Sequence, residues 1–250
     1  MLMKNGRRVF SGLIAALALT GCGGTEEELF SGARPEGEPV QVVEQGTSVI
    51  SGYDIALRST AAHTATGFVM PRWTAPSTHS TNDYIALAKV GSANTEFVAW
   101  SYVGSAGATN GVLALAIPAG VDTSAQYEVR YFLNDTTTLG AKTAAFSIQP
   151  LPIQNCAWSE SGGELPEAQG VSVGKTSGTV SFSFDHGTVH DRTIVYQGTS
   201  VLFDSGCVTG GRTVSLNFST TSGRLRVALQ PSCTYSSSGT GWSWNMGCAQ

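Results

Sequence analysis

Apolar and polar residues alternate in short segments from residue 40 to the end of the chain, and this period of two is the pattern of β-strands. Outside the first 21 residues, no stretch sustains the i, i+3, i+4, i+7 spacing of an amphipathic helix. Only 13% of the residues are charged and 30 of the 250 are glycine, which favours β-sandwiches over helical bundles. We therefore expect an all-β fold of two consecutive β-sandwich (immunoglobulin-like) domains.

The N-terminus has the layout of a secretory signal peptide. Lys4, Arg7 and Arg8 form a basic segment, and an apolar run from Val9 to Leu19 follows it. This run is shorter than the ~20 apolar residues that span a bilayer. We therefore expect export and cleavage rather than a membrane-spanning helix.

The sequence Leu19-Thr20-Gly21-Cys22 at the end of this run resembles the lipobox of bacterial lipoproteins. The resemblance implies that residues 1–21 are removed and that the Cys22 thiol is acylated and becomes the new N-terminus. In Gram-negative lipoproteins a residue other than Asp after the cysteine is the usual outer-membrane address, so Gly23 implies the bacterial outer membrane or cell surface. The alternative is an ordinary secretory signal with an incidental cysteine.

Residues 22–39 are expected to be a flexible, acidic tether. They contain Glu26-Glu27-Glu28, Pro35, Glu36 and Glu38 and little that could be buried. Loss of the three basic residues of the signal peptide would take the net charge from −4 to −7. Anionic headgroups repel such a chain, so the lipid must hold it at the membrane. It also lacks the basic footprint of a nucleic-acid-binding protein.

The four remaining cysteines, Cys156, Cys207, Cys233 and Cys248, all lie in the second half of the chain. An even number of cysteines in an exported chain predicts disulfides. These four contain no C-x2-C pair, which is the spacing that would favour a zinc site. We expect Cys156 to pair with Cys248, because domain termini often lie close together. We expect Cys207 to pair with Cys233, because each follows a predicted strand. Pairing of Cys156 with Cys207 and of Cys233 with Cys248 is the alternative.

The segment Pro150-Leu151-Pro152 separates the cysteine-free half from the cysteine-bearing half, and proline ends strands and stiffens linkers. We therefore expect domains at residues 40–150 and 153–250. The clearest predicted strands are residues 84–90, 97–103, 112–117, 127–132 and 143–148 in the first domain, and 179–184, 192–196, 200–203, 213–218, 225–229 and 241–244 in the second.

Three segments of the first domain resemble an immunoglobulin-like, SKICH-type domain that is often appended to secreted bacterial hydrolases. They are Asp83-Tyr84-Ile85-Ala86-Leu87, Trp100-Ser101-Tyr102 and Tyr127-Glu128-Val129-Arg130-Tyr131-Phe132, with conservative departures at Tyr84 and Ala86. The resemblance covers residues 50–148 and implies a non-catalytic scaffold or binding role. Trp100 is then expected in the core, with ligand stacking as the alternative. Arg130 is expected to pair with Asp83 or Glu128 on the sheet surface.

The second domain resembles a β-sandwich module of large secreted bacterial proteins, and some carbohydrate-binding modules look similar. The matching segments are Gly178-Thr179-Val180-Ser181-Phe182, Asp191-Arg192, Leu202-Phe203-Asp204-Ser205-Gly206-Cys207 and Gly239-Thr240-Gly241-Trp242. The module carries no residue-level function over to this chain.

Asp185, His186, His190 and Asp191 form the densest group of metal-ligand residue types. They could hold zinc, and the Asp carboxylates together with carbonyl groups could hold Ca²⁺. Gly187 places the group in a loop between two strands, where H-x3-H has no preset geometry. An ordinary exposed loop is therefore the main expectation, and no cofactor is required.

Tyr235, Trp242 and Trp244 are the candidates for ligand binding, because aromatic rings on an exposed strand could stack on sugars. Trp242 and Trp244 share one face of a strand by the period of two. Burial of at least one of them in the core is the competing expectation. The chain contains no G-x-S-x-G elbow and no phosphate-binding loop.

These features together predict a lipid-anchored protein of the bacterial cell surface with a binding, adhesion or structural role and no catalysis. Its expected partners are the membrane, through the lipid, and a glycan or a surface protein. The alternative is a small surface hydrolase or metal-dependent enzyme centred on residues 185–191.

Overall fold

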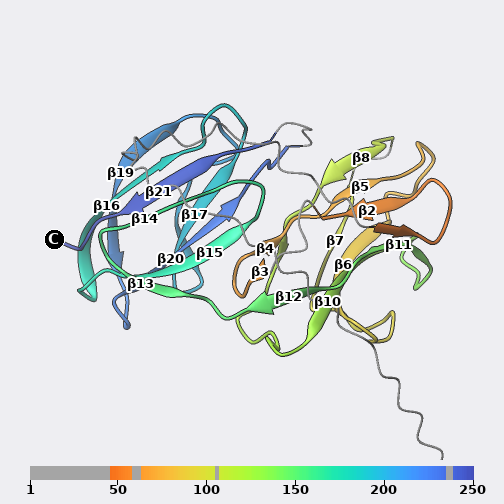
Figure 1. Ribbon diagram of the computed structural model, residues 1–250, viewed down its shortest axis with the longest axis horizontal. Coiled ribbons are helices and arrows are strands. Elements are labelled where there is room, and N and C mark those ends of the chain that lie inside the picture. Colours follow the sequence, from red (N-terminus) through yellow and green to blue (C-terminus); the bar gives the residue numbers. More distant parts are fainter. Residues whose placement is uncertain (1–45, 58–62, 105–106, 235–238) are drawn as a thin grey trace, which may run out of the picture. The chain divides into compact units, whose positions relative to one another are not determined.

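A computed structural model describes residues 46–57, 63–104, 107–234 and 239–250, and the regular structure in these ranges consists of β-strands (Figure 1). The expected all-β fold is confirmed, and the strands form two sandwich-like bodies. None of the described residues belongs to a helix that could cross a membrane. The predicted lipobox at Cys22, the tether and Tyr235 lie outside the described residues.

The described residues of the first body form twelve strands. They are β1 (Gly46–Ser48), β2 (Asp54–Ala56), β3 (His63–Thr64), β4 (Phe68–Val69), β5 (Arg72–Thr74), β6 (Tyr84–Lys89), β7 (Ala99–Tyr102), β8 (Asn110–Val112), β9 (Leu115–Ala116), β10 (Gln126–Phe132), β11 (Leu139–Thr143) and β12 (Phe146–Gln149). The largest sheet has the order β1-β11-β10-β12-β3, and β6 pairs with β10 and with β7. The order β2-β5-β8 and the pair β4-β9 complete the body.

The core of the first body lies between these sheets. Ile85 and Leu87 of β6 and Val129 and Tyr131 of β10 project into it, and Trp73 of β5 meets them from the opposite side. The period of two in β6 and β10 is therefore the direct cause of their burial, because alternate side chains lie on one face of a strand.

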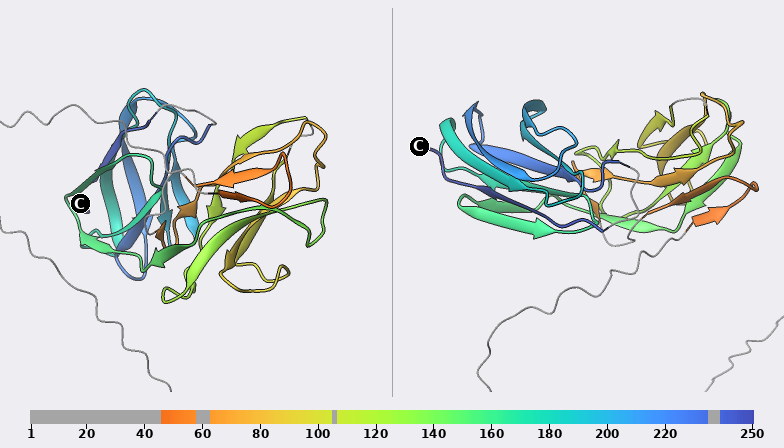
Figure 2. Two further views of the ribbon diagram at one scale, coloured as in Figure 1. Left: turned by 45° about the vertical axis from the view of Figure 1, so that its right-hand side comes forward. Right: turned by 90° about the horizontal axis from the view of Figure 1, so that it is seen from above.

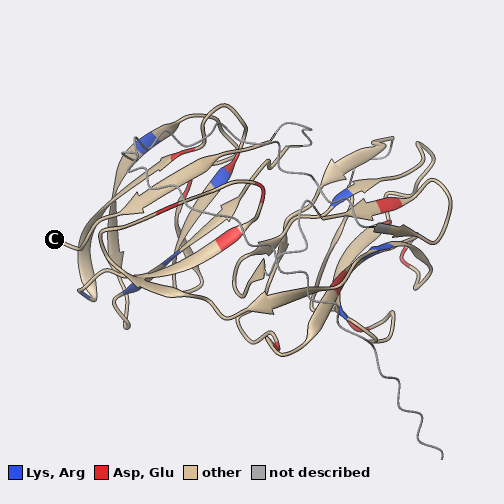
Figure 3. Cartoon of the chain, in the orientation of Figure 1, with Lys and Arg blue, Asp and Glu red and all other residues tan. Residues whose placement is uncertain are grey.

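In the second body the part of the chain that the structure describes forms nine strands in two sheets, drawn from green-cyan to blue in Figures 1 and 2. One sheet has the order β13-β15-β20-β17-β18 and the other the order β14-β21-β16-β19. The strands are β13 (Ile153–Asn155), β14 (Trp158–Gly162), β15 (Glu167–Ser172), β16 (Ser177–Asp185), β17 (Arg192–Gln197), β18 (Ser200–Asp204), β19 (Gly211–Ser219), β20 (Arg224–Gln230) and β21 (Trp242–Met246). Charged residues are sparse along these strands, as the low charged fraction of the sequence requires (Figure 3).

Both disulfides expected from the sequence are present. Cys156 is bonded to Cys248, with 4.8 Å between their Cα atoms, and Cys207 to Cys233, with 6.0 Å. The first closes a separation of 92 residues and the second one of 26. In the chain-entropy view the longer closure destabilises the unfolded chain by about 1 kcal/mol more than the shorter one.

One predicted strand is wrong in its extent. Residues 112–117 form two short strands rather than one, because β8 pairs with β5 in one sheet and β9 pairs with β4 in another. The partner strands β4 and β5 are themselves separated by Met70 and Pro71. The chain therefore changes sheet between β8 and β9 just as it does between β4 and β5.

Every strand pair lies within residues 46–149 or within residues 153–246, on either side of the Pro150-Leu151-Pro152 segment. By contacts, however, residues 39–250 form one compact unit. A small apolar cluster of Phe68, Met70, Ala168, Ile194 and Ala228 contains residues from both bodies. Independent folding of the predicted domains therefore stays a prediction.

We expect the free energy of unfolding to fall by about 3 kcal/mol through His63 as the pH drops from 6.5 to 4. Burial of His63, whose ring meets that of Phe146, lowers its pKa to about 4. The folded state therefore favours the neutral ring. The contribution of the neutral His63 ring to the free energy of unfolding is complete above pH 6.5. It is lost at lower pH, because the unfolded chain takes up a proton there and the folded chain does not.

Urea unfolding of the wild type and of His63→Phe across this pH range would measure the effect. His190→Gln is the control, because His190 is exposed. Burial raises the pKa of Glu167 to about 7, so this carboxyl increases the free energy of unfolding as the pH falls. Its effect is the same in the wild type and in both variants and cancels in the comparison. An equally steep loss of stability in His63→Phe would contradict the prediction.

Candidate functional site

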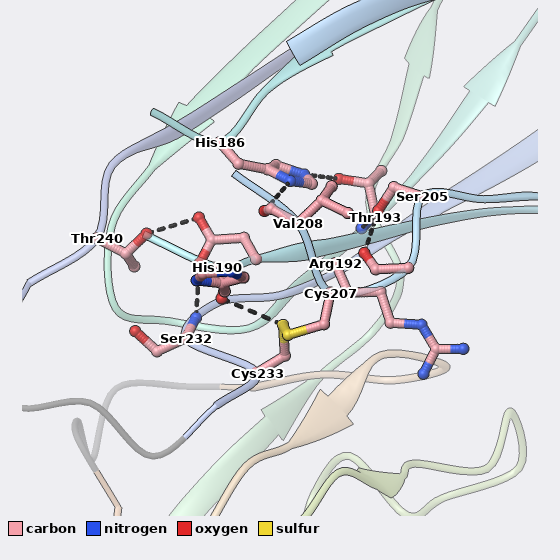
Figure 4. Close-up of a disulfide and its surroundings, with 12 residues drawn as sticks. His186, His190, Arg192, Thr193, Ser205, Cys207, Val208, Ser232, Cys233 and Thr240 are labelled. Carbon is pink, nitrogen blue, oxygen red and sulfur yellow. Dashed lines mark hydrogen bonds between the residues drawn. A yellow bond between two sulfur atoms is a disulfide. The ribbon is translucent and has the colours of Figure 1, made fainter. Parts of the chain in front are cut away.

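The loop expected to offer a metal site gives its side chains separate tasks. Asp185 is exposed and its Oδ1 accepts a hydrogen bond from the Gly187 amide (2.9 Å). His190 is also exposed, and its carbonyl oxygen accepts a hydrogen bond from the Cys233 amide (3.0 Å). Figure 4 shows this neighbourhood around the disulfide of Cys207 and Cys233.

His186 is a fully buried core histidine. Its Nδ1 lies 3.1 Å from the carbonyl oxygen of Val208, and its Nε2 lies 2.8 Å from Oγ1 of Thr193 (Figure 4). Since a carbonyl can only accept, Nδ1 carries the proton and Nε2 accepts from the threonine hydroxyl. Burial lowers the pKa of His186, which keeps this neutral tautomer in place.

Asp191 is also buried and joins three segments of the second body. Its Oδ1 accepts a hydrogen bond from the Ser232 amide and its Oδ2 one from the Thr240 hydroxyl, both at 2.6 Å. The backbone of Asp191 pairs with that of Val208. These charge-assisted hydrogen bonds tie the segments of Ser232 and Thr240 to one carboxylate, and the backbone of Asp191 holds the segment that follows Cys207.

The structure therefore does not bring Asp185, His186, His190 and Asp191 together around one point. Across the described ranges, no three His, Cys, Asp or Glu side chains are grouped so that they could hold a metal ion. Asp191 and His186 are turned inward to satisfy backbone and hydroxyl groups, whereas Asp185 and His190 lie outside.

The ligand-stacking hypothesis for Trp242 and Trp244 is wrong. Both side chains are only 3% exposed and pack in the core of the second body. The indole nitrogen of Trp242 donates to the carbonyl oxygen of Gly163 (2.8 Å), which satisfies its polar atom. The third candidate, Tyr235, lies outside the described residues.

Exposed aromatic rings gather instead on the first body. Trp100 is 52% exposed and Tyr102 is 43% exposed, so the expectation that Trp100 lies in the core is wrong. Together with Tyr84, Phe97 and Asp135 they line an open hollow of about 400 Å³. We call this set of five residues the aromatic recess.

Strand pairing explains why these rings point outward. Trp100 lies opposite Ala86 and Tyr102 opposite Tyr84, so all four share one face of the sheet. The opposite face of β7 carries Ala99 and Ser101. Their partners on β6, Leu87 and Ile85, project into the core, so the small residues of β7 lie on the core face.

The rings of the recess meet at steep angles. The planes of Trp100 and Tyr102 cross at 87° with centroids 5.2 Å apart, and Tyr84 meets Trp100 at 73° and Phe97 at 70°. Behind them Tyr84 stacks on Phe132 at 4.9 Å. Such aromatic packing fixes the exposed rings on a rigid support.

A polar rim borders the recess. The Tyr102 hydroxyl donates to Oδ1 of Asp135 (2.9 Å), and this hydrogen bond raises the pKa of the tyrosine. The Tyr84 hydroxyl donates to the carbonyl oxygen of Thr136 (2.9 Å). Both tyrosines therefore connect the ring cluster to the turn between β10 and β11.

Arg130 holds a second loop against the recess. Its Nε donates to Oε1 of Glu128 (2.8 Å), its Nη1 to the Ala93 carbonyl and the Asn94 side chain (both 3.2 Å), and its Nη2 to the Lys89 carbonyl (3.3 Å). The predicted pairing with Glu128 is present. It is buried rather than on the surface, because the loop from β6 to β7, which also carries Phe97, covers it.

No protein-family model matches the chain, and no curated protein matches it in sequence. Among solved structures, the chain is similar to the pre-peptidase C-terminal domain of a collagenase from Bacillus anthracis, with 6% identity and a TM-score of 0.32 over 38% of this chain and 93% of that domain. It is also similar to tripeptidyl peptidase 2, with 6% identity and a TM-score of 0.24 over 78% of this chain and 20% of that protein. Function therefore has to be argued from the chain's own residues.

The two disulfides indicate that the protein folds in an oxidising compartment, as secreted and extracellular proteins do.

We expect Arg130→Met to lower the free energy of unfolding by about 3 kcal/mol, because it removes one member of a buried ion pair and four hydrogen bonds. Lys142→Met is the matched control. Its Nζ donates to the same carboxylate (2.9 Å), but its side chain is 41% exposed, so its loss should cost less than about 1 kcal/mol. Urea unfolding would measure both free energies of unfolding. Equal losses in the two variants would contradict the role of Arg130 in holding the loop from β6 to β7.

Proposed function

We propose that this chain is an exported binding protein, held at the outer membrane by lipid on Cys22, whose recognition surface is the aromatic recess. The observation that supports this most directly is the exposure of Trp100 at 52%, beside Tyr102 at 43%. Of the other four indoles, those of Trp73, Trp242 and Trp244 are buried and that of Trp158 is half-buried. Exposed Trp and Tyr rings beside one carboxylate are typical of binding sites.

The hydrogen bonds of the second body support a binding role over the alternative of an enzyme centred on residues 185–191. His186 and Asp191 are turned into the fold, each with both polar side-chain atoms in hydrogen bonds. A hydrolytic site needs a base and a nucleophile that reach a substrate. We therefore assign these two residues to structure and the recess to binding.

The lipid anchor rests on the sequence Leu19-Thr20-Gly21-Cys22 and on the acidic tether that follows it. Several acyl chains on one cysteine would hold the chain firmly, at about 0.8 kcal/mol for each buried CH2 group. The tether would display the recess at a distance from the headgroups.

We expect Cys22→Ser to leave the precursor unprocessed or to release the protein from the membrane fraction, because the serine cannot form the thioether that carries the lipid. Cell fractionation followed by a high-salt wash would measure this, with Cys207→Ser as a control that leaves Cys22 intact. A Cys22→Ser protein that stays with the membranes at wild-type levels would argue against the anchor.

A carbohydrate is the ligand class that we test first, because the exposed face of an indole stacks on the apolar face of a sugar ring. We expect Trp100→Ala to lower affinity for a bound glycan at least about ten-fold. Val201→Ala is the control, because Val201 is equally exposed, at 56%, but lies on the second body. A glycan array followed by titration would test this. Equal loss in both variants, or none in Trp100→Ala, would count against the recess.

A further inference from the structure

The chemistry of the aromatic recess is unusual for a general sugar site. Its walls are the rings of Tyr84, Phe97, Trp100 and Tyr102, and its one charged group is Asp135. Both tyrosine hydroxyls already donate to groups of the chain. A site that reads the many hydroxyls of a sugar needs several free donors and acceptors, and this lining offers few.

Asp135 has capacity left for a positively charged ligand. It is exposed, and its Oδ1 accepts one hydrogen bond, from Tyr102. Within the part of the chain that the structure describes, Asp135 forms no ion pair. By contrast, the exposed carboxylates of Asp122 and Asp204 are paired with Lys89 and Arg192.

The position of Asp135 is fixed by the turn that carries it. Asn134 and Asp135 adopt left-handed φ angles of 49° and 55°, which Asn and Asp tolerate better than most residues. The Asn134 amide donates to Oδ1 of Asp83 (2.9 Å), and the Asp135 amide donates to the carbonyl oxygen of Asn82 (3.0 Å). Asp83 is buried and also accepts the Tyr131 hydroxyl (3.0 Å), so the turn is tied to the core.

We infer that the recess binds an organic ammonium group, such as the trimethylammonium head of choline. Aromatic faces attract such cations through the ring quadrupole, and a compact cation suits walls that are inclined to one another. The Asp135 carboxylate supplies the opposite charge. The inference rests on the proposed function and narrows its ligand, because it makes a cationic group, rather than a neutral sugar ring, the preferred occupant of the recess.

Titration of the purified mature protein with choline and with 3,3-dimethylbutan-1-ol tests the inference. The alcohol has the shape of choline without the charge. We expect choline to bind with a dissociation constant on the order of 1 mM, as for an open site with few contacts, and the alcohol to bind at least about ten-fold more weakly. The indole signal of Trp100 in NMR spectra, assigned with Trp100→Phe, reports binding at the recess.

Asp135→Asn separates charge from shape. Asparagine keeps the left-handed turn and can still accept the Tyr102 hydroxyl, so we expect choline affinity to fall about five-fold or more while binding of the alcohol is unchanged. Asp122→Asn is the matched control, because it removes the same charge from an exposed site paired with Lys89 and should leave choline affinity unchanged. Trp100→Ala should abolish binding of both probes.

Equal affinity for choline and the alcohol, or equal loss in Asp135→Asn and Asp122→Asn, would overturn the inference. Glycan binding lost in Trp100→Ala with no choline binding would overturn it too and would leave the proposed function standing. Absence of both would remove the proposed function itself. Binding to vesicles of phosphatidylcholine, compared with binding to vesicles of phosphatidylglycerol, identifies the kind of molecule that carries the ammonium group. Selective binding to phosphatidylcholine vesicles points to a lipid headgroup. Competition of phosphocholine with choline for the recess, without binding to the vesicles, points to a soluble or polymer-borne group.

Discussion

The antiparallel register of β6 against β10 and β7 decides which face of the first body is apolar and which is aromatic. Ile85 pairs with Tyr131 and Ser101, which sends all three toward the core. Tyr84 pairs with Phe132 and Tyr102, which puts these rings on the other face, where Phe132 and Tyr84 are buried beneath Phe97 and Trp100 and Tyr102 is exposed. A slip of one residue would exchange the two faces, so the core and the recess depend on the same pairing.

The strand pattern of the sequence was sufficient to predict the all-β fold, the long strands β10 and β16, and the two disulfides. It was not sufficient to predict the outward side of β7, because the period of two shows alternation and not direction. The expectation that Trp100 lies in the core comes from the resemblance of its segment to an immunoglobulin-like domain, and the alternation itself places Trp100 and Tyr102 on one face without saying which face. Only the partners Ile85 and Leu87, which lie across the ladder, decide the matter.

Residues 185–191 show the converse. Two histidines and two aspartates within seven positions suggested a metal site, yet the β-bridge of Asp191 with Val208 turns Asp191 and His186 inward. There Asp191 accepts hydrogen bonds from the Ser232 amide and the Thr240 hydroxyl, and His186 donates to the carbonyl of Val208, which follows Cys207. No local sequence pattern contains Val208, Ser232 or Thr240, because these partners lie between 17 and 49 residues away.

The position of the recess within the sheet has a mechanical consequence. Strands β1, β11, β10, β6 and β7 are successive neighbours in one hydrogen-bonded sheet, and β1 is the first described strand after the tether. If the chain is anchored through Cys22 as proposed, a pull on a ligand held by β6 and β7 would act across this sheet. The second body, which has its own two disulfides, would carry no tension. The force that the bound protein withstands would therefore depend on the strand pairing of the first body.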